Sequence, residues 1–111
     1  MKPLLVYITT KDSSEAEQIS KRLLEERLVA CVNIFKEIRS SFWWEGKIDH
    51  MQEVLLIAKT VADHQEAIAN LVSKSHSYQC PCVLFIPVEG GHEPYLDWIK
   101  NEVNPEKREK R

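Results

Sequence analysis

Hydrophobic positions along the 111-residue chain follow two periods, and each period predicts a different kind of element. An apolar, β-rich run at 4–9 that ends in polar residues predicts a strand. Apolar residues at helical spacing then predict an amphipathic helix over 13–27, with Asp12 or Ser13 as its N-cap. Oppositely charged side chains four residues apart line the other side of that helix, so we expect that side to face solvent.

The middle of the chain predicts a long β-hairpin. Apolar and aromatic runs at 29–35 and 38–44 predict two strand segments, and 45–47 supplies a turn in which Gly46 can adopt a positive φ. The run at 53–60 is almost continuously apolar, which is typical of a strand buried on both faces. We therefore expect this third strand of the chain to be central in the sheet.

The second half repeats the order of the first half. A second helix is expected from Thr60, then a loop at 75–81, a strand at 83–86 and a short helix at 93–102. The tail at 104–111 is mostly charged and is expected to be disordered or an exposed helix end. Residues 1–103 then form one domain, which is an ordinary size for a single domain.

Two β-α-β units joined by a hairpin predict an α+β fold, namely a ferredoxin-like split βαβ sandwich with a C-terminal helix. In this fold the helices cover one face of the sheet and leave the other face bare. Phe42, Trp43 and Trp44 add apolar bulk to the hairpin. Because bare faces and long edges promote association, we expect the hairpin to form an interface between copies.

Charge and cysteine content exclude several classes of protein. The net charge is −2 and no basic stripe is visible, which argues against nucleic-acid binding. No apolar run reaches the roughly 18 residues of a membrane span. Three cysteines without a secretory signal suggest reduced thiols and a cytoplasmic location. A domain of this size needs no metal or disulfide for folding.

Five segments in order resemble the CutA (divalent-cation tolerance) family, and together they span most of residues 4–99. They are LVACVNI at 28–34, SFWWEGK at 41–47, EVLLIAKT at 53–60, HSYQCP at 76–81 and YLDW at 95–98. The resemblance implies a ferredoxin-like subunit that closes into a homotrimer through its sheets, similar in architecture to PII-type signalling trimers. It also implies a role in tolerance to divalent metals, above all copper, with no enzymatic activity.

The resemblance carries over only part of a known metal site. In some bacterial members a copper site is proposed from a first-strand cysteine and two consecutive histidines, and the matching positions here are Ile8, Ser75 and His76. Only His76 retains a metal-binding side chain. A second departure is Cys82, which stands where the family usually has glutamate.

His76, Cys80 and Cys82 are the candidate metal ligands. Thiolates and imidazole suit Cu²⁺ or Zn²⁺, and residues two apart in an extended segment project to the same side. The spacing is not that of a zinc finger. The alternative is that Cys82 begins a buried strand and packs there as a small hydrophobic residue.

Cys31, Lys59 and Tyr78 are candidate ligand-binding residues, together with His76. Lys59 could bind an anion, and Cys31 could react if a nearby cation stabilised its thiolate. In the alternative interpretation all of them have structural roles. No Ser-His-Asp order, HExxH motif or phosphate loop is present.

These observations and the family resemblance lead to three alternative hypotheses about function. The first is a non-catalytic trimer that binds divalent cations in metal homeostasis. The second is a PII-like trimeric scaffold whose inter-subunit clefts bind a small anionic ligand or a partner protein. The third is a cleft enzyme that uses Cys31 or His76.

Overall fold

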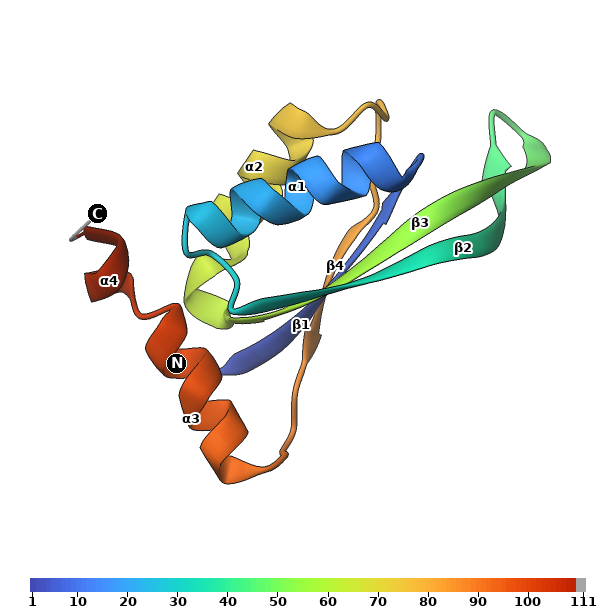
Figure 1. Cartoon of the computed structure of the whole chain (residues 1–111). Coiled ribbons are helices and arrows are strands. Elements are labelled where there is room, and N and C mark those ends of the chain that lie inside the picture. Colours follow the sequence, from blue (N-terminus) through green and yellow to red (C-terminus); the bar gives the residue numbers. More distant parts are fainter. Residues whose placement is uncertain (110–111) are drawn as a thin grey trace.

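The computed structural model describes residues 1–109, in which a four-stranded sheet is packed against helices (Figure 1). Neighbouring strands are antiparallel and lie in the order β2-β3-β1-β4. The predicted α+β class and the central position of β3 are therefore confirmed. The elements are β1 (Pro3–Thr10), α1 (Ser13–Glu25), β2 (Cys31–Trp44), β3 (Lys47–Val61), a 3₁₀ turn η1 (Ala62–His64), α2 (Gln65–Ser75), β4 (Val83–Pro87), α3 (Glu93–Glu102) and α4 (Pro105–Glu109).

Helix α1 begins and ends at well-defined caps. Asp12 is the N-cap, and its carboxylate accepts the backbone N–H of Glu15 at 2.9 Å. At the other end Arg27 adopts φ 55°, and the N–H of Leu28 bonds the carbonyl of Leu23 at 3.0 Å. This is a Schellman motif, which normally places glycine at the position that Arg27 occupies. The motif ends the helix two residues before the predicted boundary.

The hairpin is longer and more continuous than the sequence indicates. The two predicted segments form one strand, β2, whose register with β3 shifts between Phe35 and Ile38. The predicted turn is confirmed, because the two-residue connection has φ 50° at Glu45 and 79° at Gly46. Positive φ at both positions is the requirement of a type I′ turn, whose twist matches that of the strands.

The predicted start of the second helix at Thr60 is wrong. Strand β3 continues to Val61, and α2 begins only at Gln65, after the 3₁₀ turn. Thr60 is fully buried, and its hydroxyl donates to the carbonyl of Leu28 at 2.5 Å. Its side chain therefore ties β3 to the segment after α1, a contact that no local pattern reveals.

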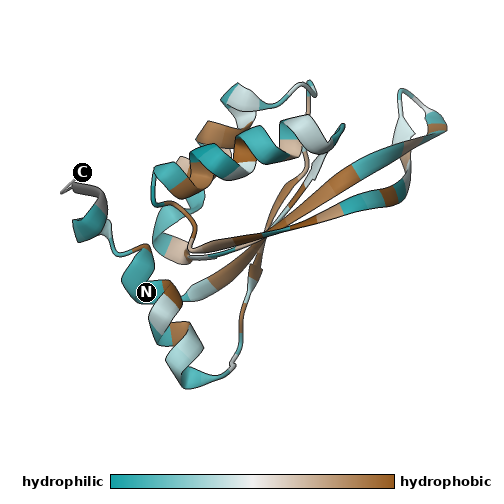
Figure 2. Cartoon of the chain, viewed as in Figure 1, coloured by the Kyte–Doolittle hydropathy of each residue, from teal (hydrophilic) through white to brown (hydrophobic). Residues whose placement is uncertain are grey.

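The core lies between one face of the sheet and helices α1 and α2, which lie on the same side of it (Figure 1). Figure 2 shows hydrophobic residues concentrated in the central strands and hydrophilic residues along much of α1. No helix within residues 1–109 has both the length and the hydropathy to cross a membrane. The core side chains include Val6, Ile8, Ala16, Ile19, Leu23, Leu56, Ala58, Ile68 and Val72.

Within residues 1–109, helix α3 covers one end of the opposite face of the sheet, which we call the open face. There α3 packs Ile99, with the following Val103, onto Val61. At the other end β2 and β3 extend as a ribbon well beyond the helices (Figure 1), and the molecule measures 44 × 29 × 23 Å. The charged tail is described up to residue 109, where 105–109 form α4, and the rest of the expected tail lies outside the described residues.

Candidate functional site

The loop after α2 is anchored by His76, the C-cap residue of that helix. Its side chain is fully buried. Nδ1 accepts the backbone N–H of Tyr78 at 3.0 Å, and Nε2 lies 2.7 Å from the carbonyl oxygen of Thr9. Because a carbonyl can only accept, Nε2 carries the proton and the ring is the neutral Nε2–H tautomer. Both nitrogens are thus engaged, and neither offers a free lone pair to a metal.

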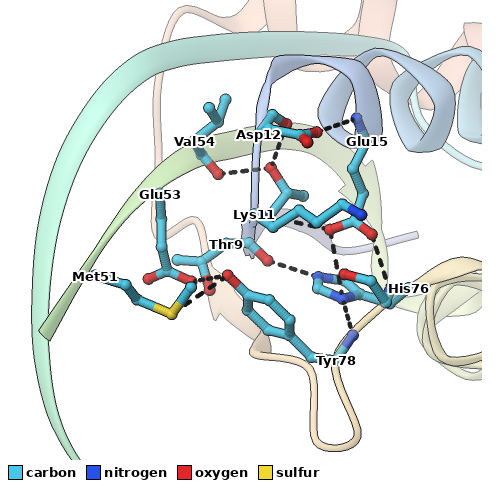
Figure 3. A network of polar contacts seen from close by, with 11 residues as sticks. Thr9, Lys11, Asp12, Glu15, Met51, Glu53, Val54, His76 and Tyr78 are labelled. Carbon is cyan, nitrogen blue, oxygen red and sulfur yellow. Dashed lines mark hydrogen bonds and ion pairs between the residues drawn. The ribbon is translucent and has the colours of Figure 1, made fainter. Parts of the chain in front are cut away.

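Glu15 connects the same loop to the start of α1 (Figure 3). One carboxylate oxygen accepts the N–H of Ser77 at 2.9 Å, and the other accepts the N–H of Lys11 at 3.1 Å. The latter oxygen also lies 3.7 Å from Nδ1 of His76. Burial alone would raise the pKa of Glu15, but the hydrogen bonds from Ser77 and Lys11 outweigh it and hold this pKa below its ordinary value.

Tyr78 reaches from the loop to the open face of the sheet. Its hydroxyl donates to the Glu53 carboxylate at 2.8 Å and lies 3.7 Å from the sulfur of Met51 (Figure 3). Its ring lies against His76, with centroids 4.6 Å apart. Burial and the bond to Glu53 raise the pKa of Tyr78, so the hydroxyl remains a donor at neutral pH.

Beside Tyr78 lies a cavity of about 490 Å³ between the loop and the β2–β3 ribbon, which we call the hairpin groove. Its lining combines aromatic rings, two carboxylates and three sulfur-containing side chains. Such a mixed, concave surface is typical of a ligand site. The groove is lined by Tyr7, Thr9, Ser40, Phe42, Trp44, Asp49, Met51, Glu53, Tyr78, Gln79, Cys80 and Cys82.

The three predicted metal ligands separate into a pair and a single residue. Cys80 and Cys82 line the hairpin groove, whereas His76 does not. Within the described residues no group of three or more His, Cys, Asp or Glu side chains is placed to hold a metal ion. Of the other two positions that match the bacterial copper site, Ile8 is fully buried in the core and Ser75 bonds to Arg22.

The predicted ligand-binding residues also fall into two places. Lys59 lies on the open face beside Cys31, with Nζ 3.6 Å from the thiol sulfur, and it also bonds the Asn33 side chain. Tyr78 contacts Glu53, six residues along β3 from Lys59, which is roughly 20 Å at the rise of a strand. In one chain these residues therefore do not form a single site.

Several residues that lie beside the candidate site residues were not themselves predicted as site residues. Tyr95 of α3 lies near Cys31, and burial, followed by the electrostatic influence of this thiol, raises the pKa of Tyr95. Glu53 and Met51 line the groove, although the pattern assigned Glu53 only to a strand and nothing to Met51. Strand alternation could have placed Glu53 and Lys59 on one face, since they are six residues apart.

Comparison with known proteins gives a consistent result. Residues 4–102 match the family described as CutA1 divalent ion tolerance protein. The divalent-cation tolerance protein CutA of Archaeoglobus fulgidus is 48% identical over 98 residues, which cover 88% of this chain and 95% of that protein. The rice protein CutA 1, chloroplastic, is 38% identical, and the match spans only 55% of its length.

Solved structures agree with these matches. The structure described as the periplasmic CutA of A. fulgidus superposes with a TM-score of 0.89 at 46% identity, covering 92% of this chain and 99% of that one. Rice CutA1 superposes with a TM-score of 0.91 at 35% identity, covering 95% and 96% of the two chains. On the family match and these relatives, the chain belongs to the CutA1 divalent ion tolerance protein family.

Proposed function

We propose that this protein acts in tolerance to divalent metal ions as a non-catalytic homotrimer of ferredoxin-like subunits. The observation that carries the proposal is the family match across residues 4–102. The strand order β2-β3-β1-β4 supports the ferredoxin-like description, because β1 and β2 run in the same direction on either side of β3. The role in metal tolerance rests on the family and not on a metal site in the single chain.

The open face supports assembly into a trimer. Phe35, Leu84 and Ile86 on this face are 48%, 55% and 43% exposed, although they belong to the sheet. A monomer rarely leaves such a contiguous apolar surface in water. Packing of this face and the ribbon against neighbouring copies would remove it from solvent at roughly 25 cal/mol per Å² of apolar area.

The side chains of one chain do not by themselves fit a divalent metal. Cys80 and Cys82 supply two thiols, but His76 uses both ring nitrogens internally. A structural Zn²⁺ site takes four ligands. A Cu²⁺ or Zn²⁺ ion at these thiols would therefore need further ligands from another copy in the trimer.

Calorimetric titration with Zn²⁺ and, separately, Cu²⁺ tests the proposal. We expect binding by the wild-type trimer, loss of binding in the double variant Cys80→Ser/Cys82→Ser, and retained binding in His92→Ala, which changes an exposed histidine outside the groove. The absence of saturable binding of either ion by the wild type would refute direct divalent-metal binding. Light scattering of the same samples measures the molar mass and hence the oligomeric state.

The second candidate is a PII-like scaffold that binds a small anion between subunits. The Lys59 contacts among the described residues are the neutral groups of Asn33 and Cys31 rather than a carboxylate. No carboxylate among residues 1–107 forms an ion pair with this ammonium group. A thermal-shift screen with nucleotides and organic acids would detect such a ligand, and Lys59→Gln should abolish the shift.

A cytoplasmic location also belongs to the proposal. Its support is the three free cysteines, one of them exposed, which suit a reducing compartment. The names of two family members give other compartments: the rice protein is called chloroplastic, and the A. fulgidus structure is called periplasmic. Fractionation of the native cells with immunodetection distinguishes these compartments.

A further inference from the structure

Cys31 and Lys59 are directly opposite each other, at the start of β2 and near the end of β3. The Nζ atom of Lys59 lies 3.6 Å from the thiol sulfur and also bonds the side chain of Asn33. Residues two apart on a strand project to the same face, so Cys31 and Asn33 hold the amino group above that face together. The sulfur and the nitrogen are thus close to the roughly 3–3.5 Å that separates reacting atoms in a near-attack geometry.

Helix α3 covers this end of the open face from within the same chain. Tyr95 lies near Cys31, while Ile99 and Val103 form a buried cluster against which Ala30 packs. Cys31 and Lys59 are both half-buried. A reaction that joins them needs only a small oxidant to enter, because both side chains belong to one chain. It is therefore compatible with the packing of other copies against the open face.

No other cysteine of the chain can reach Cys31. Strands β3 and β1 lie between β2, which begins with Cys31, and β4, which directly follows Cys82. Three strand spacings amount to roughly 14 Å, whereas the Cα atoms of a disulfide lie roughly 4–7 Å apart. Cys80 lines the same groove as Cys82. An oxidised Cys31 would therefore meet the Lys59 nitrogen and not a second thiol of its chain.

We propose that Cys31 and Lys59 are a modification site, at which hydrogen peroxide produces a covalent sulfenamide bond between Sγ and Nζ. Peroxide first converts the thiol to a sulfenic acid and releases one water, and sulfenic acids condense with nearby nucleophiles. The Lys59 ammonium loses a proton to solvent, and its lone pair attacks the sulfur. The S–O bond breaks, and the leaving hydroxide takes a proton from the nitrogen as a second water. One thiol, one amine and one peroxide thus give one S–N bond and two waters, with the sulfur oxidised and the peroxide reduced.

The bond changes both the charge and the connectivity of this end of the sheet. It replaces the ammonium group of Lys59 with an uncharged nitrogen, and it ties β2 to β3 covalently. Excess thiol reagent reduces the S–N bond and restores both side chains. The site does not rest on the proposed role in metal tolerance, since neither a metal ion nor the hairpin groove takes part.

The test uses the full chain as the double variant Cys80→Ser/Cys82→Ser, which leaves Cys31 as its only thiol. The folded variant is treated with one molar equivalent of hydrogen peroxide, digested with trypsin and analysed by mass spectrometry. We expect peptides 28–36 and 48–74 to be joined, with the sum of their masses less two hydrogen atoms. Dithiothreitol should separate them. If the two peptides stay separate, or if 28–36 is joined to a peptide without Lys59, the assignment is wrong.

Two further variants in the same background test the role of Lys59. Lys59→Arg keeps the positive charge but offers a guanidinium that stays protonated, so we expect a sulfenic acid that dimedone traps and no joined peptides. Lys74→Arg changes an exposed lysine of α2 and should form the bond like the double variant. Thermal melting verifies that each variant is folded.

The geometry itself is tested by unfolding the double variant in guanidinium before peroxide is added. Because only the folded sheet holds Sγ and Nζ side by side, the yield of joined peptides should then fall to background. An equal yield from folded and unfolded protein would overturn the proposal, as would an equal yield from Lys59→Arg.

Discussion

His76 joins parts of the chain that are far apart in the sequence, because it bonds both Thr9 in β1 and Tyr78 in the following loop. Replacement by alanine would leave the Thr9 carbonyl and the Tyr78 N–H without these partners. We expect His76→Ala to lower the free energy of unfolding by about 2–4 kcal/mol, the cost of unsatisfied buried polar groups. Guanidinium denaturation at fixed protein concentration measures the change.

The control for this prediction is His92→Ala. His92 is the exposed N-cap of α3 and its side chain makes no capping hydrogen bond. Its replacement should change stability by less than about 0.5 kcal/mol, as is usual for surface positions. Equal stability of the two variants would contradict the anchoring role of His76.

Glu15 predicts a pH dependence of stability. Its pKa is held below the ordinary value of 4.5, so the folded state binds this proton more weakly than the unfolded state. The resulting stabilisation is present above pH 4.5 and is lost as the pH falls below that value through the folded-state pKa. In denaturation at a series of pH values, Glu15→Gln should lose less stability over this acidic range than the wild type. Glu17→Gln, on the exposed side of α1, should behave like the wild type.

Of the candidate metal ligands, the sequence predicts the placement of the two cysteines better than the engagement of His76. The thiols of Cys80 and Cys82 could be placed together from their spacing, and both line the hairpin groove. The engagement of His76 could not be predicted, because its partner Thr9 lies 67 residues away. A pattern that shows only the presence of an imidazole cannot show that both of its nitrogens are occupied.

Among the elements, α1 ends with a residue in an unfavourable conformation. Arg27 has φ 55°, which costs a non-glycine residue about 1–2 kcal/mol, while its guanidinium bonds Glu102 of α3. Arg27→Gly removes the conformational cost and the ion pair, whereas Arg27→Ala removes only the ion pair. We expect the glycine variant to be more stable than the alanine variant by about 1 kcal/mol in chemical denaturation.

A partly exposed ion pair of this kind contributes at most about 1 kcal/mol. Arg27→Gly should therefore differ little from the wild type. A glycine variant that is less stable than the alanine variant would show that the left-handed conformation of Arg27 carries no measurable cost.

The elements could be predicted where the signal is local. The Asp12 cap and the turn at Gly46 depend on neighbouring residues, and both are confirmed. The wrong start of α2 at Thr60 has a physical reason, since β3 is extended by tertiary contacts of Thr60 that outweigh the local helix signal. The expected break in β2 is instead a shift of register, because pairing with β3 resumes at Ile38.

At the scale of the whole molecule, the apolar open face predicts that a charge introduced on it will disrupt the assembly of copies. Leu84→Asp places a carboxylate on the edge strand β4, within the apolar surface proposed to contact other copies. We therefore expect dissociation of the proposed trimer, measured by light scattering. Leu24→Asp is the matched control, because Leu24 on α1 is 42% exposed on the other side of the molecule. A wild-type protein that is monomeric at micromolar concentration would contradict the trimer itself.

The ribbon at the end of the hairpin has one more consequence. Strand β1 pairs with β3 only over Val54–Val61, so 47–53 pair with β2 alone among the described residues. A two-stranded ribbon in water is marginally stable by itself. In an isolated chain the tip should fray ahead of the rest, and its amides should exchange with deuterium through local opening. The exchange rates of the Trp43 and Ile48 amides would thus measure the fraction of chains whose ribbon is packed against another copy.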